Sequence, residues 1–293
     1  MSGQIAVINH RQFGARRDMG ISSFSEDFAY PNILYRDELD LEIGGLKILI
    51  RHGRGETDDH SWVFFPEHRI LCTGDFFIWA MPNAGNPQKV QRYALEWAGA
   101  LRKMASLRPE ILSPGHGLPI IGQGRVKKAL EDTAGFLEDL SDQVLRLMNR
   151  GIGLQEIIES VELPPDLLKL PYLQPAYDEA EFLIRNIWRL YAGWYDGIPS
   201  HLKPASEKAL AEEVLLLIGD LKKLISRVEE HLLNGDIRLA THLAEWAYRA
   251  APSDKEVVRL IKRVYLERAE RETSIMTKGI FLAASNEVEV FKS

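Results

Sequence analysis

The sequence predicts an α/β layer followed by an all-α region, because the hydrophobic pattern changes near residue 125. Before that point, short apolar runs alternate with turn signals, which is typical of a sheet with helices packed on it. After it, apolar residues recur at helical spacing between glycine and proline breaks. A chain of 293 residues with 45% hydrophobic residues has room for two domains. We place them at residues 1–124 and 125–285.

Strand and turn signals dominate the first region. "LDLEIGGLKILIRHG" predicts two strands that pair around the Gly44-Gly45 turn. "SWVFFPEHRILCTGD" predicts two more strands, at 61–65 and 69–73, joined at "PEH". "VQRYALEWAGALRKMASL" has apolar residues at helical spacing and is followed by Pro109, which would stop the helix. "EILSPGHG" then predicts a short strand that enters a glycine-rich loop.

Helical periodicity fills the second region. The predicted helices span 125–149, 153–161, 178–194, 207–233, 236–250 and 254–272. The last two, which turn at Pro252, resemble one tetratricopeptide-like helical hairpin. No second copy with the same period follows, so the pattern does not favour a solenoid.

Composition argues against several classes of function. The net charge is −6 and no basic patch is concentrated in the sequence, which argues against nucleic-acid binding. No apolar run approaches the roughly 18–20 residues that span a bilayer, and the N-terminal stretch lacks the apolar core of a signal peptide. The single cysteine, Cys72, excludes an intrachain disulfide and fits a reducing compartment. We therefore expect a cytoplasmic location and no membrane span.

Three potential metal ligands fall at predicted strand ends. Glu56 precedes the strand at 61, Asp75 follows the strand at 69, and His116 follows the strand at 110. Loops at one edge of an α/β sheet would bring these oxygen and nitrogen donors together, as divalent metal hydrolases require. Adjacent glycines would let the backbone turn sharply. Taken singly, an aspartate after a strand is more often a turn or helix-capping residue.

Further polar side chains lie between the first two candidates. Asp58, Asp59 and His60 form either an ordinary solvated turn or a set of groups that support the metal ligands through hydrogen bonds. His52 and His68 fit surface positions.

Several of these motifs resemble a known family. "GET", "FFPEHRILCTGD" and "SPGHG" are similar to the last three metal-binding motifs of the metallo-β-lactamase superfamily. Glu56 stands where most members have a histidine, which resembles the zinc alkylsulfatase branch, as does its position 19 residues before Asp75. That branch typically has a glutamate where this chain has Asp75. "FLIRNIWRLYAGWYDGIPSHLKP" resembles the signature of the alkylsulfatase dimerisation domain, and "GDIRLATHLAEWAYRAAPSD" resembles its later helices.

The resemblance implies a fold, a reaction and partners. It implies a partial αββα sandwich over 1–124, a helical dimerisation domain over 125–285, a homodimer and a small-molecule ester substrate. In the intact family site, two zinc ions share a hydroxide that attacks a sulfate or related ester. Glu56 would belong to one ion and His116 to the other, with Asp75 between them. The segment 82–104 resembles the one that borders the substrate cavity, without a role for each residue.

One motif of the superfamily has no counterpart. The HxHxDH motif supplies most of the zinc ligands, and no two of the eight histidines are spaced as HxH. The expectation is an N-terminally incomplete hydrolase domain. Because a catalytic zinc needs about three protein ligands, we expect weak zinc affinity and impaired or absent hydrolysis. One alternative is a non-catalytic dimerisation or scaffold protein derived from the enzyme. Another is an RNA-processing or phosphodiesterase member of the superfamily, but Glu56 and the dimerisation signature count against that one.

Overall fold

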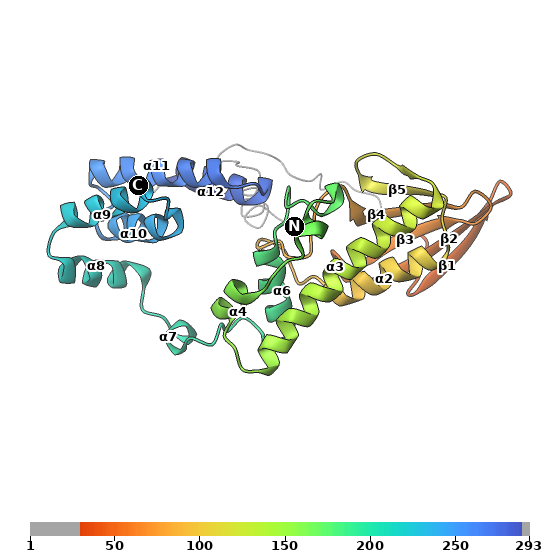
Figure 1. The fold of residues 1–293 in the computed structure, drawn as a ribbon, viewed down its shortest axis with the longest axis horizontal. Coiled ribbons are helices and arrows are strands. Elements are labelled where there is room, and N and C mark those ends of the chain that lie inside the picture. The colour runs from red at the N-terminus through yellow and green to blue at the C-terminus, as the bar shows by residue number, and fades with distance from the viewer. Residues whose placement is uncertain (1–29, 289–293) are drawn as a thin grey trace. The chain divides into compact units, whose positions relative to one another are not determined.

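The computed structural model describes residues 30–288, and within them the chain forms two compact units, 30–197 and 198–288 (Figure 1). The N-terminal stretch considered for a signal peptide lies outside the described residues. The predicted α/β layer and the predicted helical region are both confirmed. The domain boundary at residue 125 stays a prediction, and the helices that follow it up to residue 197 pack with the sheet in one unit.

A mixed sheet organises the first unit, with its strands in chain order. Neighbouring strands are antiparallel except for the parallel pair β4–β5. The strands are β1 (Glu38–Ile43), β2 (Leu46–Gly53), β3 (His60–Phe65), β4 (Ile70–Ile78), β5 (Ile111–His116) and β6 (Ile120–Ile121). The predicted β1–β2 hairpin is confirmed, since Gly44 and Gly45 both have the positive φ that a tight hairpin turn requires.

Two predictions about strand ends are wrong. β4 continues to Ile78, so Asp75 lies inside the strand and not after it. His116 is the last residue of β5 and not the residue that follows it. The reason lies at Gly74, whose φ of +51° coincides with a shift in the β4–β5 register. This bulge turns the strand locally and lets its pairing with β5 resume beyond Asp75.

Helices cover the sheet and complete the first unit. Figure 1 shows α2 and α3 running side by side against the strands. Their apolar faces bury Trp97, Leu101 and Leu137 against strand residues such as Leu71 and Phe76. The helices are α2 (Ala94–Ser106), α3 (Gln123–Asn149), α4 (Leu154–Ser160), α5 (Pro165–Leu168), the 3₁₀ helix η2 (Pro171–Leu173) and α6 (Ala180–Ala192).

The second unit is helical throughout its described part. It contains α7 (Pro199–Leu202), α8 (Glu207–Ile218), α9 (Leu221–Leu233), α10 (Ile237–Ala250), α11 (Lys255–Arg271) and α12 (Ile275–Glu287). The single helix predicted over 207–233 is wrong, because Gly219 ends α8 in the left-handed conformation and Asp220 caps α9. Small residues on α10, among them Ala240 and Ala244, form its buried face. Over residues 30–288, no helix is both long and apolar enough to cross a membrane.

Candidate metal centre

Asp75 and His116 are brought together by the parallel pairing of β4 and β5. The distance from His116 Nε2 to Asp75 Oδ1 is 3.5 Å. Gly115 makes this approach possible, because a Cβ atom at that position would lie 2.0 Å from Asp75 Oδ1 and 2.8 Å from the carbonyl carbon of Gly74. The glycine next to the histidine is therefore a steric requirement of the site.

Glu56, in the loop between β2 and β3, is the second neighbour of Asp75. The two carboxyl groups lie close enough to share a hydrogen bond when one of them carries a proton. Burial raises the pKa of Asp75, and the charge of Glu56 and this hydrogen bond raise it further, while His116 and Arg92 oppose the rise. Two carboxylates in such proximity repel each other when both are ionised, so a cation beside them stabilises the pair.

The loop between β4 and α2 supplies the other partners of Glu56. Arg92 Nη1 lies 2.8 Å from Glu56 Oε1, and Asn83 Nδ2 donates a hydrogen bond of 2.7 Å to the same oxygen. The guanidinium of Arg92 also donates to the backbone carbonyl of Asn83. Because the Arg92 side chain is only 3% exposed, its charge is matched by a carboxylate inside the protein and not by solvent.

His60, at the start of β3, is packed beside the carboxylates. Its ring stacks on Phe76 with centroids 3.9 Å apart and meets the edge of Trp97. Burial lowers the pKa of His60, which favours the neutral ring. Its Nδ1 atom is buried and makes no hydrogen bond within the described part of the chain, and the same holds for Asn83 Oδ1 and Arg92 Nε. Buried polar atoms normally have partners, so these three leave hydrogen-bonding capacity unused near Glu56.

The remaining polar residues of the 55–75 stretch point elsewhere. Asp58 and Asp59 are exposed, and the backbone carbonyl of Asp58 accepts a 2.8 Å hydrogen bond from His52 Nε2. His68 is exposed, as expected, whereas His52 is half-buried. Any support that Asp58, Asp59 or His60 gives to the metal ligands stays a prediction.

The donor set fits a divalent cation in its chemistry, since it combines two carboxylates and an imidazole. In the structure, however, the candidate ligands contact each other in pairs, Glu56 with Asp75 and Asp75 with His116. Within residues 30–288, no group of three or more His, Cys, Asp or Glu side chains is arranged so that it could hold a metal ion. The His116 side chain is 76% exposed, so the candidate centre is open to solvent on the β5 side.

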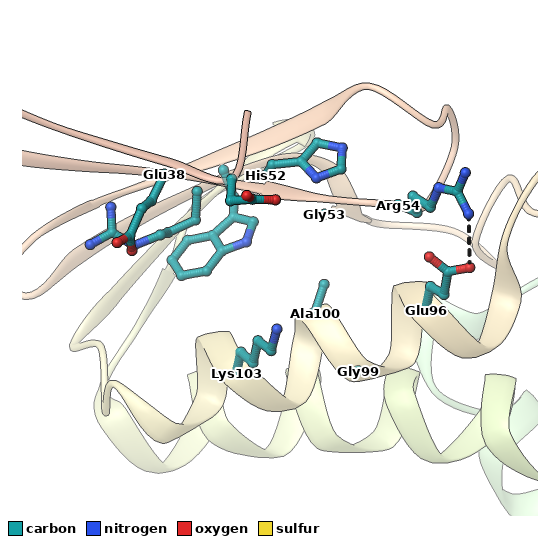
Figure 2. A pocket seen from close by; sticks show the side chains of 11 residues that line it. Glu38, His52, Gly53, Arg54, Glu96, Gly99, Ala100 and Lys103 are labelled. Carbon is teal, nitrogen blue, oxygen red and sulfur yellow. Dashed lines mark hydrogen bonds and ion pairs between the residues drawn. The ribbon is translucent and has the colours of Figure 1, made fainter. Parts of the chain in front are cut away.

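A separate pocket of about 520 Å³ lies between β2 and α2 (Figure 2). Figure 2 shows His52 and Arg54 on the strand side and Glu96, Ala100 and Lys103 on the helix side. Arg54 pairs with Glu96 at 3.3 Å across its rim. None of the three candidate ligands lines this pocket, so it is not part of the candidate centre.

The residues that hold Glu56 were missed in the sequence. Asn83 and Arg92 lie 27 and 36 positions from Glu56, and no local periodicity links such positions. The one available signal was the resemblance of 82–104 to a segment that borders the substrate cavity, which marks the region but not the two side chains.

Two family models match the chain. Residues 9–116 match the metallo-beta-lactamase superfamily, and residues 153–290 match the alkyl sulfatase dimerisation family. A linear primary-alkylsulfatase of Pseudomonas sp. (strain ATCC 19151) is 28% identical over 89% of this chain and 50% of that protein. An (R)-specific secondary-alkylsulfatase of Pseudomonas sp. is 28% identical over 77% of this chain and 35% of its own length. The chain thus spans about half, or less, of the length of these relatives.

A solved structure agrees in fold. The stereoselective inverting sec-alkylsulfatase Pisa1 from Pseudomonas sp. superimposes with a TM-score of 0.88 at 22% identity, over 98% of this chain and 48% of that one. The chain therefore has a partial metallo-β-lactamase fold with a mixed sheet, followed by a helical domain. Within the metallo-β-lactamase superfamily, the dimerisation-domain match and the curated relatives together support the alkylsulfatase branch. Alkylsulfatases of this superfamily are typically metal-dependent.

Proposed function

We propose that this chain carries part of an alkylsulfatase-like metallohydrolase centre, which acts on sulfate or related esters of small molecules. The observation that carries the proposal is the cluster at the sheet edge, where the carboxyl groups of Glu56 and Asp75 adjoin and Asp75 lies 3.5 Å from His116. Three buried polar atoms without partners among the described residues adjoin it. The relatives' names, all alkylsulfatases, support the substrate class.

In this proposal Glu56, Asp75 and His116 would hold the metal. A zinc ion bound there would lower the pKa of a coordinated water and polarise an ester oxygen. Arg92 and Asn83 keep the Glu56 carboxylate oriented towards Asp75 through their contacts at 2.8 and 2.7 Å. The packing of His60 on Phe76 and Trp97 fixes the position of its ring beside the carboxylates.

The chain by itself holds zinc weakly in this proposal. Three protein ligands divided between two ions leave each ion short of the roughly three ligands that a catalytic zinc needs. Hydrolysis by residues 1–293 alone is therefore impaired or absent. A segment with further histidines would have to complete the centre.

Zinc titration of the purified chain tests the ligand assignment. Asp75→Asn and His116→Ala should each reduce zinc uptake further, because each removes a donor. The matched controls, Asp142→Asn on the exposed face of α3 and His68→Ala at an exposed turn, should leave it unchanged. Equal zinc uptake by all four variants would contradict the assignment. Two tightly held zinc ions in the unaltered chain would contradict the incomplete centre.

We also propose a homodimer formed through the helical region. The support is the match of residues 153–290 to a dimerisation family and the exposure of large apolar side chains in the second unit, including Leu216, Leu217 and Leu233. Light scattering after size exclusion should give twice the chain mass. A monomer at high micromolar concentration would contradict this proposal.

A non-catalytic scaffold is the second candidate function. The Arg92–Glu56 ion pair favours it, because a resident guanidinium already neutralises the carboxylate that a metal would use. A dimer that takes up no zinc at any concentration would support the scaffold and exclude the metal centre.

A further inference from the structure

The loop that grips Glu56 is itself fixed by the segment that leads into α6. Asp178 is fully buried, and its Oδ2 accepts a 2.6 Å hydrogen bond from the backbone N–H of Gly85. Its Oδ1 accepts from the N–H of Glu179 at 2.8 Å. A Cβ atom on Gly85 would lie 2.3 Å from the backbone nitrogen of Leu183, so the loop touches the backbone of α6 directly.

α6 holds the other end of the same loop through Asn186. The side-chain amide of Asn186 donates to the backbone carbonyl of Arg92 at 2.9 Å, and its oxygen accepts from the Arg92 N–H at 3.4 Å. The backbone carbonyl of Asn186 accepts from Gln91 Nε2, and Arg189 Nε donates to Gln91 Oε1. The backbone of residue 92 is therefore held on both its donor and its acceptor side.

These contacts continue to the candidate metal ligand without a break. Arg92 and Asn83 both bind Glu56 Oε1. The N–H of Tyr93 donates to the backbone carbonyl of Gly55 at 3.1 Å, immediately before Glu56. A shift of the loop would therefore move the Glu56 backbone and release its carboxylate at the same time.

We propose that Asp178 and Asn186 are positioning residues of the candidate metal centre, which act on Glu56 through the loop 83–92. The expected effect on metal binding rests on the proposed function, since Glu56 is a proposed ligand. Asn186 lies in the "RN" string that resembles a dimerisation signature, but in this proposal its role is to hold the loop 83–92 of its own chain. Asn186 is 5% exposed and faces the loop, whereas its neighbour Arg185 is exposed and pairs with Glu181 on the same helix.

The variant Asn186→Leu tests the proposal, with Arg185→Gln as the matched control one position away. Hydrogen–deuterium exchange should become faster in peptides that cover 83–92 and also in peptides that cover 54–60, with 123–149 as the internal reference. Zinc affinity should fall about 10–100-fold, the range seen when groups that orient metal ligands are removed. Arg185→Gln should change neither readout.

Asp178→Ala and Asp178→Asn form a second, graded pair in case Asn186→Leu does not fold. Asp178→Asn keeps an acceptor oxygen for the Gly85 N–H, so exchange at 54–60 should increase less than in Asp178→Ala. Faster exchange confined to 83–92, with 54–60 and zinc affinity unchanged, would show a purely structural role and overturn the proposal. If the unaltered chain takes up no zinc, the proposed function fails, and exchange at 54–60 still decides whether these residues position Glu56.

Discussion

The buried polar groups of the two compact units make hydrogen bonds over different distances along the chain. In the second unit, buried hydroxyls bond to the helix backbone nearby: Thr241 donates to the carbonyl of Ile237, and Ser274 accepts from the N–H of Thr277. In the first unit, buried polar side chains reach far along the chain, and the Arg92–Asn186 contacts span 94 positions. Local contacts stabilise helices, whereas a costly network that converges on one carboxylate indicates a site.

Ion pairs differ by exposure and not by unit. Most pairs of both units are at least partly exposed, and each unit has pairs at helical spacing, as with Lys127 and Glu131 in the first unit and Arg263 and Glu267 in the second. Such pairs contribute about 0–1 kcal/mol each. The Arg92–Glu56 pair is shielded from solvent on the arginine side and adjoins a second carboxylate. The side chains suited to metal binding or catalysis therefore lie in the first unit.

Breaking the buried pair should have the largest effect. In Arg92→Met, the carboxylates of Glu56 and Asp75 lose their buried cation, and removing one partner of a buried pair costs about 3–5 kcal/mol. Urea denaturation in the presence of a chelator measures this loss. Arg102→Met, which breaks an exposed pair with Glu138, should cost no more than about 1 kcal/mol. Equal losses in the two variants would contradict the contrast between buried and exposed pairs.

The pH dependence of stability should reveal Asp178. Burial raises its pKa to about 7 against two opposing backbone hydrogen bonds. Because this pKa lies above the unfolded value of about 3.9, the folded state binds more protons between roughly pH 4 and 7. Stability therefore falls as the pH rises through that window, by about 4 kcal/mol at about 1.4 kcal/mol for each pKa unit, and it stays level above the window.

Asp178→Asn removes this titration. The free energy of unfolding of the variant relative to the unaltered protein should therefore improve between pH 4.5 and 7.5. Denaturation curves at both pH values measure the change, and groups common to both proteins cancel in the difference. An identical difference at the two pH values would show that Asp178 does not titrate as described.

Gly115→Ala should damage the site and the fold together. The new Cβ would overlap Asp75 Oδ1 at 2.0 Å, and overpacking of this kind costs about 1–3 kcal/mol. Zinc uptake should fall as well, because Asp75 must move. Gly99→Ala in α2 meets no atom within 4 Å and should stabilise the protein by up to about 1 kcal/mol. A Gly115→Ala protein with normal stability and zinc uptake would contradict the steric requirement at that glycine.

The smallest effect is expected in the helical unit. Gly219→Ala places a Cβ in open space, so its cost is only the left-handed backbone, about 1–2 kcal/mol. Zinc uptake should not change, because no described contact links Gly219 to the candidate ligands. A change in zinc uptake in this variant would argue against confining the chemistry to the first unit.

Local sequence patterns predicted the turns and helices that depend on neighbouring residues alone. The Gly44-Gly45 hairpin and the α2 helix follow from turn residues and periodicity, and both are confirmed. The break at Gly219 was missed because the apolar pattern continues across it, and only the glycine marks the end of α8. The extension of β4 past Asp75 was missed because a bulge at Gly74 depends on pairing with β5.

The site was predictable only in part. Glu56, Asp75 and His116 could be selected because their residue types and flanking glycines carry metal chemistry, and the structure brings Asp75 next to each of the other two. Asn83, Arg92, Asp178 and Asn186 could not be selected, because their roles come from hydrogen bonds between distant segments. Conversely, Asp58 and Asp59 have suitable chemistry but lie exposed.

Anomalous diffraction at the zinc absorption edge, from crystals of the chain grown with zinc, locates any metal bound at this edge of the sheet. We expect a peak about 2.0–2.2 Å from an Asp75 oxygen, with Glu56 or His116 completing the ligands. A peak at unrelated surface histidines, or no peak while the Arg92–Glu56 pair persists, would contradict the assignment of a metal centre to this edge of the sheet.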